Sequence, residues 1–260
     1  MQWPRKDWPE AKCVRTVEGP ILINPISFAA LIVDWSMTFG MGYGIGVEGA
    51  HELTLPALRT LRLFPRNRRI CTRDVHPYGH ISFASSFVGY SDFYDLTYDE
   101  VKDWTPDNHR IAPHALFSLD ELKEYLLIVG HQILWPDHGI EGDDEARVNP
   151  YIEPECTITW NKGNRPHRDS NSAFQDNGGI STRLDEYIAC RRITTLVVWG
   201  IAGDVCAGLT ALHGKQRGFD VYFVTDLSPC VSAEGRDSMY EQLIAAGVHL
   251  ITSDQLRAAA

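Results

Sequence analysis

Three residues that could together form a nucleophilic site, Asp34, Lys162 and Cys206, each follow an apolar segment of this sequence. Cys206 comes six residues after the segment 194–200, at the start of an expected helix, whose N-terminus lowers a thiol pKa and offers N–H groups to an oxyanion. Asp34 ends FAALIVD and Lys162 ends CTITWNK. A charge at the end of an apolar strand must be solvated, paired or functional. We therefore predict that Asp34 takes the thiol proton and Lys162 stabilises the thiolate.

A second group of residues has the chemistry of a metal site. Asp74 and His76 lie two apart after another apolar segment, in RDVHPYGH, and His138 lies in LWPDH. Two imidazoles and a carboxylate suit zinc, iron(II) or manganese and leave coordination positions open. A capped strand end explains the Asp74–His76 pair equally well, and His80 could be a fourth ligand or a supporting residue. Three further histidines read as surface residues: His109, His114 and His131.

The elements that must position these residues alternate between strands and helices. Strands are expected at 28–34, 68–74, 156–162, 194–200, 220–226 and 248–252, and helices at 53–63, 119–129, 205–217 and 233–246. Ser118 and Glu121 form a capping box before the second helix. The alternation predicts an α/β fold, a three-layer αβα arrangement with a mostly parallel six-stranded sheet. Ligands of such sheets bind beyond the carboxyl ends of the strands.

The chain reads as one domain with two additions. Residues 1–27 contain four prolines and are expected to form an N-terminal extension, followed by a single domain over 28–260. Within it, an insertion at about 88–132 is expected to be irregular apart from its helix. The glycine-rich segment 39–49 has no phosphate-loop spacing, which leaves a flexible active-site loop or a plain surface loop.

Composition narrows the class of partner. The 260 residues include 24 basic and 34 acidic ones, a formal net charge of −10, which argues against nucleic acid and against an anionic membrane surface. The sequence has no apolar run of membrane-spanning length, and its first residues lack the apolar core of a secretion signal, so a cytoplasmic protein is expected. Six widely spaced cysteines without a CxxC are expected to be reduced thiols.

These motifs, taken in order, resemble the cysteine hydrolases of the isochorismatase-like superfamily and specifically its nicotinamidases (pyrazinamidases). ALIVDWSMTF resembles ALIVVDxQxxF, which places a catalytic aspartate at Asp34 and a substrate-packing phenylalanine at Phe39. NKG resembles the KG of the catalytic lysine, with DSNSAFQDN like DSYSAFxDN after it, and GIAGDVCAGLTAL resembles GLATDxCVxxTAL. The resemblance thus implies Lys162 as the catalytic lysine and Cys206 as the nucleophile.

The metal segment is also similar to that of nicotinamidases. TRDVHPYGHISFA resembles DWHPxxHxSFA and implies Asp74 and His76 as ligands. LWPDHGIEG resembles WPxHCVxG and implies His138 as the third ligand, with Trp135 as a wall of the substrate pocket. One divalent ion is implied, with zinc as the expected metal and iron or manganese as alternatives. In this family the metal binds the pyridine nitrogen and orients the ring.

The resemblance implies hydrolysis of nicotinamide to nicotinate and ammonia through a thioester. The oxyanion would meet backbone N–H groups of Ala202 and Cys206, with a cis peptide bond between Ile201 and Ala202. Four positions depart from the family pattern: Ser36 for Gln, Gly139 for Cys, Asn171 for a frequent Tyr, and Gly203 for Thr. Asn171 and Gly203 could loosen the pocket, which weakens the prediction of nicotinamide more than that of amide hydrolysis.

Three alternatives stay open beside a metal-dependent nicotinamidase. The same cysteine site could act on another small amide, a carbamoyl compound or a ureido acid. The fold could serve a non-catalytic binding protein. The metal could activate water in a hydrolase that does not use Cys206. The expected partner is a small amide, with no nucleic acid and no membrane, and the oligomeric state is left open.

Overall fold

The central element of the fold is a six-stranded parallel sheet, seen in a computed structural model that describes residues 14–39 and 45–259. The strand order is β6-β3-β2-β7-β8-β9. The strands are β2 (Phe28–Val33), β3 (Arg69–Asp74), β6 (Ile158–Lys162), β7 (Thr195–Gly200), β8 (Asp220–Val224) and β9 (His249–Ile251). Each lies within the segment expected to form it, so the predicted α/β class with a mostly parallel sheet is confirmed. Residues 1–13 of the N-terminal extension, with Cys13, and residues 40–44 of the glycine-rich segment lie outside the described residues.

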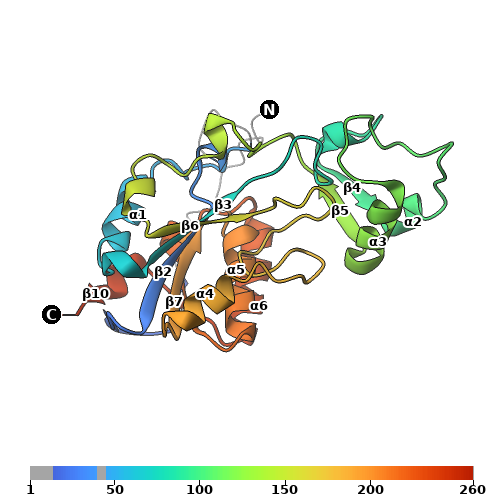
Figure 1. Ribbon diagram of the computed structural model, residues 1–260. Coiled ribbons are helices and arrows are strands. Elements are labelled where there is room, and N and C mark those ends of the chain that lie inside the picture. The colour runs from blue at the N-terminus through green and yellow to red at the C-terminus, as the bar shows by residue number, and fades with distance from the viewer. Residues whose placement is uncertain (1–13, 40–44, 260) are drawn as a thin grey trace.

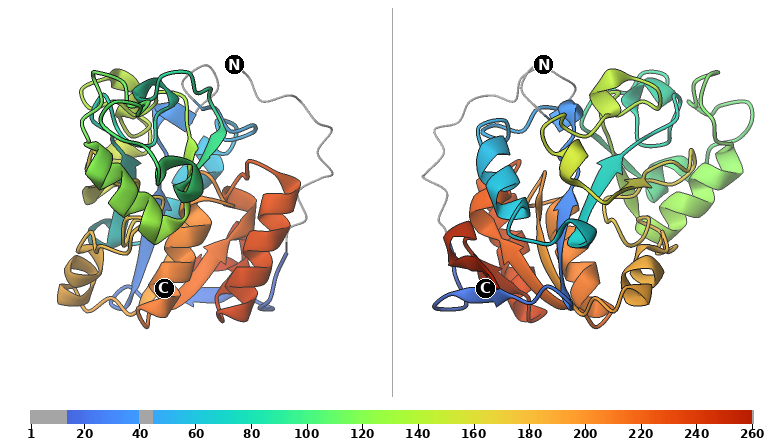
Figure 2. Two further views of the ribbon diagram at one scale, coloured as in Figure 1. Left: turned by 90° about the vertical axis from the view of Figure 1, so that its right-hand side faces the viewer. Right: turned by 60° about the vertical axis from the view of Figure 1, so that its left-hand side comes forward.

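Helices cover both faces of this sheet and make the three layers (Figures 1 and 2). One face packs on α1 (Thr54–Leu61), and the other on α4 (Leu184–Cys190), α5 (Cys206–Gln216) and α6 (Ala233–Ala245). Successive residues of β2 alternate between the two cores, because side chains of a strand point to opposite faces. Burial on both faces explains why the strands read as continuous apolar runs rather than as alternating ones.

The expected insertion contains more regular structure than its sequence predicts. Besides α2 (Tyr98–Val101) and α3 (Leu119–Val129), it forms an antiparallel pair, β4 (Tyr94–Thr97) with β5 (His131–Leu134). The helix begins at the expected residue, with the Ser118–Glu121 capping box in place. The expectation of an otherwise irregular segment was wrong because the two strands are short and lie on opposite sides of that helix in the sequence, so their pairing is a tertiary contact.

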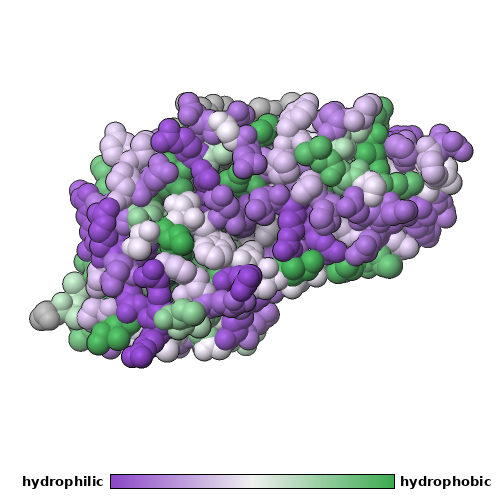
Figure 3. All heavy atoms as spheres, in the orientation of Figure 1, coloured by the Kyte–Doolittle hydropathy of each residue, from purple (hydrophilic) through white to green (hydrophobic). Residues whose placement is uncertain are grey.

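These elements form a lobe beside the main sheet, at the right of Figure 1. The lobe has a hydrophobic cluster of its own, which includes Leu96, Leu122, Tyr125 and Leu126. It also leaves large hydrophobic side chains exposed: Val88, Phe93, Tyr94, Leu116, Leu127 and Ile128. Figure 3 shows hydrophobic surface on this lobe.

The two ends of the described chain form a small sheet that the sequence does not predict. In it β1 (Ile21–Ile23), which lies in the expected extension, pairs in parallel with β10 (Leu256–Ala258). Three-residue strands carry too little periodicity to be recognised. Short 3-10 helices complete the secondary structure: 37–39, 66–68, 84–86, 144–146, 153–155, 225–227 and 253–255. Among the described residues, no helix is both long and apolar enough to cross a membrane.

One pair of cysteines is oxidised. Cys71 of β3 and Cys156, just before β6, form a disulfide with a Cα–Cα distance of 5.9 Å. The expectation of reduced thiols is therefore wrong for this pair, because parallel pairing of β3 with β6 brings together two residues that are 85 apart in the sequence. The thiols of Cys190, Cys206 and Cys230 are free.

Candidate active site

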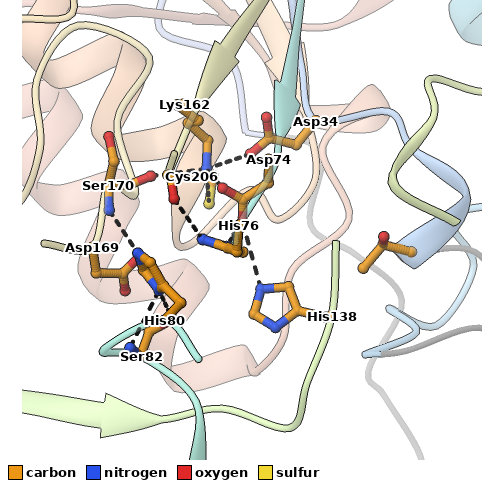
Figure 4. A network of polar contacts seen from close by, with 12 residues as sticks. Asp34, Asp74, His76, His80, Ser82, His138, Lys162, Asp169, Ser170 and Cys206 are labelled. Atoms are coloured by element: carbon orange, nitrogen blue, oxygen red, sulfur yellow. Dashed lines mark hydrogen bonds and ion pairs between the residues drawn. The ribbon is translucent and has the colours of Figure 1, made fainter. Parts of the chain in front are cut away.

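The candidate residues meet where β2, β3 and β6 end and α5 begins (Figure 4). Asp34 directly follows β2, whereas Asp74 and Lys162 are the last residues of β3 and β6 and face each other in register. Cys206 is the first residue of α5, which follows β7. Parallel strands bring their carboxyl ends to one edge of the sheet, and this geometry brings together residues that are far apart in the sequence.

Lys162 is at the centre of this group. Its Nζ lies 2.9 Å from Asp34 Oδ2 and 2.8 Å from Asp74 Oδ1, and it donates a 2.9 Å hydrogen bond to the Ser170 carbonyl. The Cys206 Sγ lies 3.6 Å from the same nitrogen. The Lys162 side chain is fully buried, so its charge is compensated by two carboxylates rather than by water. One ammonium thus connects both carboxylates to the thiol.

Asp34 is held by a threonine that the sequence analysis did not single out. Thr72 Oγ1 donates a 2.7 Å hydrogen bond to Asp34 Oδ1 and accepts one from the Asp34 backbone N–H at 3.1 Å. Asp34 itself has φ of +50°, in the left-handed region, so the extended backbone of β2 ends here. Among the described residues, Asp34 Oδ2 has an ion pair but no hydrogen bond of good geometry. That oxygen keeps a lone pair for a proton.

The protonation of the group follows from burial and charge. Burial raises the pKa of the Cys206 thiol well above its usual range; Lys162 lowers it, but Asp34 and Asp74 raise it further. The direction is therefore opposite to the lowering that was predicted from the helix N-terminus. Burial also raises the pKa of Asp34, although Lys162 opposes this. Burial lowers the pKa of Lys162, but the two carboxylates outweigh it and hold the pKa well above its usual range. The resting site therefore holds a neutral thiol, an ammonium and a carboxylate able to accept a proton.

Two backbone N–H groups at the turn between β7 and α5 have no acceptor in the described protein. In the described part of the chain, the N–H groups of Ala202 and Cys206 donate to no other protein group, whereas their neighbours Gly203, Val205 and Ala207 all donate to carbonyls. The peptide bond between Ile201 and Ala202 is cis, as the resemblance implied. Free donors at a helix N-terminus are suited to a developing oxyanion.

The expected metal ligands also lie together. One ligand atom from each of Asp74, His76 and His138 falls within 4.8 Å of the others. His76 Nδ1 contacts the Gly163 carbonyl at 2.9 Å and His138 Nδ1 contacts the Pro136 carbonyl at 2.8 Å, so each ring donates through Nδ1 and presents its Nε2 to the Asp74 carboxylate.

These Nε2 atoms lie 3.1 and 3.5 Å from Asp74 Oδ2. Burial pushes the pKa of Asp74 upward, but His76 and Lys162 outweigh it and hold that pKa well below its usual range. The carboxylate is therefore ionised, and the buried His76 Nε2 accepts no hydrogen bond in the described structure. This donor set fits a divalent transition metal.

His80 is beside the metal ligands, and both of its ring nitrogens are already engaged. Nδ1 lies 2.7 Å from Ser82 Oγ, and Nε2 lies 3.1 Å from the Arg168 carbonyl. Its ring centroid is 4.3 Å from that of His76. With Nε2 donating to a carbonyl, His80 offers no free lone pair in this geometry, which favours the supporting role over the fourth ligand.

Gly163 shows why a glycine follows the lysine. Its φ is +75°, and a Cβ added there would lie 2.5 Å from His76 Cε1 and 2.8 Å from Asp74 Oδ1. A side chain would therefore displace both expected ligands. Position 203 is a glycine for a similar reason. A Cβ there would lie 2.5 Å from the Ser228 carbonyl oxygen, so the threonine of the family pattern does not fit this backbone.

A narrow, mostly apolar cavity of about 50 Å³ opens onto these residues. Its walls include every residue expected to contact substrate, Phe39, Trp135 and Ala202, together with Cys206. The remaining lining is Ile45, Val47, Asp74, His138, Asp169, Asn171, Val205 and Val231. Asn171 thus contributes an amide to an apolar cavity, whereas Ser36 and Gly139, two other departures from the family pattern, are not part of its wall.

Sequence reasoning missed three residues of the site. Thr72 holds Asp34, Ser170 offers its carbonyl to Lys162, and Asp169 lines the cavity. Thr72 could have been found, because it lies two residues before Asp74 on the same strand and so on the same face. Ser170 and Asp169 lie in a loop, where the sequence has no periodicity from which the direction of a side chain could be predicted.

The comparisons with known proteins agree with this geometry. The family model of the isochorismatase domain matches residues 135–255. A nicotinamidase of Escherichia coli is 30% identical over 232 residues, covering 86% of this chain and 94% of the relative.

Solved structures extend the likeness to the fold. A nicotinamidase/pyrazinamidase from Acinetobacter baumanii has a TM-score of 0.74 at 27% identity and covers 89% of this chain and 99% of its own. A zinc-bound pyrazinamidase of Pyrococcus horikoshii shares the fold at 17% identity, with a TM-score of 0.62 and coverage of 87% and 99%. The chain therefore belongs to the nicotinamidase/pyrazinamidase family of isochorismatase-like hydrolases and is an amidohydrolase.

Proposed function

We propose that this protein is a metal-dependent nicotinamidase, which hydrolyses nicotinamide to nicotinate and ammonia. The observation that carries the proposal is the contact of one buried ammonium, Lys162, with Asp34, Asp74 and Cys206, of which the last two line an apolar cavity. Apolar walls that include Phe39 and Trp135 suit an aromatic ring, and the nucleophile is part of the same wall.

The first half of the reaction transfers the acyl group to sulfur. Asp34 Oδ2 accepts the Cys206 proton, and Lys162 stabilises the thiolate, which attacks the carboxamide carbon. The N–H groups of Ala202 and Cys206 hold the oxyanion. Protonated Asp34 returns its proton to the amine nitrogen, the C–N bond breaks, and ammonia leaves from a thioester.

The second half hydrolyses the thioester. Asp34, again ionised, takes a proton from water as the water oxygen attacks the carbonyl carbon. The tetrahedral species collapses, the C–S bond breaks and the proton returns to sulfur. The products are a carboxylic acid and the resting thiol, so the site is regenerated without a net change.

Asp74, His76 and His138 would hold the metal ion. A divalent ion there supplies a Lewis acid for the ring nitrogen of a pyridine carboxamide. The zinc-bound pyrazinamidase that shares the fold supports zinc as the expected ion. The protein residues pre-orient the ligands, because carbonyls fix both imidazole tautomers.

The test is ammonia release from nicotinamide by the wild type and by Cys206→Ala, with metal quantified in both. We expect turnover in the wild type alone, with about one metal per chain in each, and a loss of at least 10³-fold on removal of the nucleophile. Retained turnover in Cys206→Ala, lost on chelation, would instead favour metal-bound water as the nucleophile.

Asn171 supports a second candidate, hydrolysis of another small amide, carbamoyl compound or ureido acid. Asn171 lines the cavity at a position where the family often has a tyrosine. Its amide can hydrogen-bond the polar end of an acyclic substrate, whereas an aromatic ring does not need such a partner. A substrate panel separates the two candidates: higher kcat/KM on an acyclic amide than on nicotinamide would select the second.

A further inference from the structure

A second and larger cavity lies beside the edge strand β6, away from the thiol. Its volume is about 460 Å³, and it lies between the segments 160–170 and 176–183. The Cys206 side chain does not line it, and the reaction proposed above gives it no role. Its polar lining includes Arg165, Arg168 and Arg183.

The charge of this cavity is opposite to that of the whole protein. Its lining contains three guanidinium groups and one carboxylate, that of Asp176, in a chain whose formal net charge is −10. The carboxylates of Glu124 and Glu186, which pair with two of the arginines, lie outside the lining and are 67% and 59% exposed, so water screens them. Lys162 also lines the cavity, but Asp34 and Asp74 compensate its ammonium. A local excess of positive charge in a concave, partly desolvated site concentrates small anions.

The arginines are held in place but keep donors for a ligand. Arg165 Nη1 pairs with Asp176 at 3.0 Å, Arg168 Nη2 pairs with Glu124 at 3.1 Å, and Arg183 pairs with Glu186 at 2.8 Å. A guanidinium has five N–H donors, and within the described residues these contacts use one donor of Arg165, one of Arg168 and two of Arg183. The Arg168 side chain is only 10% exposed whereas that of Glu124 is 67% exposed, so the arginine is the fixed partner of that pair. Forked donors of this kind bind carboxylate and phosphate groups bidentately.

The wall between the two cavities is a single short segment. Alternate residues face opposite sides: Arg168 and Ser170 line the large cavity, whereas Asp169 and Asn171 line the cavity above Cys206. The Ser170 carbonyl also accepts the hydrogen bond from Lys162 Nζ. A ligand that moves this segment in the large cavity therefore also moves groups that line the cavity above Cys206.

We propose that the large cavity is a second ligand site, for a small anion with a carboxylate or phosphate group, coupled to the active site through residues 168–171. The site goes beyond the amide hydrolysis proposed above and does not depend on which amide is the substrate. Two sources share this chemistry: the carboxylate product of amide hydrolysis, and phosphate-containing small molecules.

Calorimetric titration with inorganic phosphate and, separately, with nicotinate tests the site. The informative variant is Arg165→Gln with Arg183→Gln, whose arginine side chains are 43% and 74% exposed, so that the fold is retained. The matched control is Arg59→Gln with Arg257→Gln, two exposed arginines outside the cavity that give the same change in charge.

We expect at least tenfold weaker binding of one or both anions by the cavity variant and wild-type affinity in the control. Which anion is affected identifies the source. No saturable binding of either anion by the wild type, or equal affinities in the two variants, overturns the site. Because the titration needs no turnover, a failure of the proposed nicotinamidase activity would leave this result intact.

Coupling is measured separately, as kcat/KM for the amide substrate with and without the bound anion. We expect a change of at least twofold in the wild type and the control, and none in the cavity variant. Saturable binding without any change in kcat/KM would overturn the coupling through residues 168–171.

Discussion

Lys162 combines two tasks that conflict in the resting protein. It balances two buried carboxylates, and that balance holds its pKa well above its usual range. In the proposed reaction it must also stabilise a thiolate whose formation the same carboxylates oppose. Proton transfer to Asp34 would resolve the conflict, because a neutral Asp34 frees the ammonium to face the sulfur. The proposed chemistry therefore depends on how readily Asp34 binds and releases a proton.

Thr72 influences the pKa of Asp34. Its hydroxyl donates to Asp34 Oδ1 and so favours the ionised carboxylate. Thr72→Val removes this donor, and a hydrogen bond to a charged group contributes about 1.5–3 kcal/mol. The pKa of Asp34 should rise, so the ionised base is lost at higher pH. We expect the acid limb of the pH profile of kcat/KM to move upward by about one unit.

Thr72→Ser is the matched control, since it keeps the hydroxyl. Its acid limb should stay within a few tenths of a pH unit of the wild type. If valine and serine give the same acid limb, the hydrogen bond does not set the protonation of the base.

Among the elements, the edge strand β6 and the turn after it align the thiol site with the metal site. Pairing of β6 with β3 places Lys162 opposite Asp74, and the turn then brings the Gly163 backbone against His76. The insertion lobe contacts the wall of the cavity through a chain of hydrogen bonds. Tyr125 of α3 donates to Gln132 of β5, which donates at 3.0 Å to Asp169 in the cavity wall.

Gly163→Ala should damage the metal site specifically. The new Cβ would overlap His76, whose Nδ1–H donates to the Gly163 carbonyl. Loss of such a supporting contact typically weakens metal binding about 10–100-fold. Metal content after dialysis against a weak chelator measures the effect.

Gly179→Ala provides the control for backbone strain. Gly179 has a similar φ of +88°, but a Cβ there meets nothing within 4 Å. Both variants should lose about 1–2 kcal/mol of stability from the left-handed conformation, and only Gly163→Ala should lose metal. Equal metal content in the two would show that the close approach to His76 does not matter.

The whole molecule is held by links between segments that are distant in the sequence. The parallel sheet joins six such segments, β1 pairs with β10, and the disulfide closes a loop between residues 71 and 156. That loop includes the whole insertion lobe. The disulfide therefore restricts the unfolded chain over the region that carries all three expected metal ligands.

Cys156→Ser should lower the free energy of unfolding by about 2–4 kcal/mol, because the unfolded chain regains the entropy of this loop. Urea denaturation without reductant measures the loss. With reductant, the urea midpoint of the wild type should fall to that of Cys156→Ser. Cys190→Ser, at an exposed free thiol, is the control and should stay within about 0.5 kcal/mol of the wild type. Equal midpoints for all three proteins would mean that the disulfide does not stabilise the fold.

The sequence by itself determined the sheet and the types of residue at its edge. Doubly buried strands need long apolar runs, and charged residues stand directly at the ends of these runs, so both features are local. The capping box of α3 is local too. These patterns predicted the six strands, the cluster of Asp34, Lys162 and Cys206, and the expected metal ligands as neighbours.

The tertiary structure alone decided what depends on contact between distant segments. The β4–β5 pair, the β1–β10 pair and the Cys71–Cys156 disulfide each join residues whose own neighbours in the sequence carry no signal of the partner. The thiol pKa belongs here as well: position at a helix start predicts a lowered value, but burial beside two carboxylates from other strands raises it. Burial and charge are set by the packed surroundings, and a local sequence pattern does not contain them.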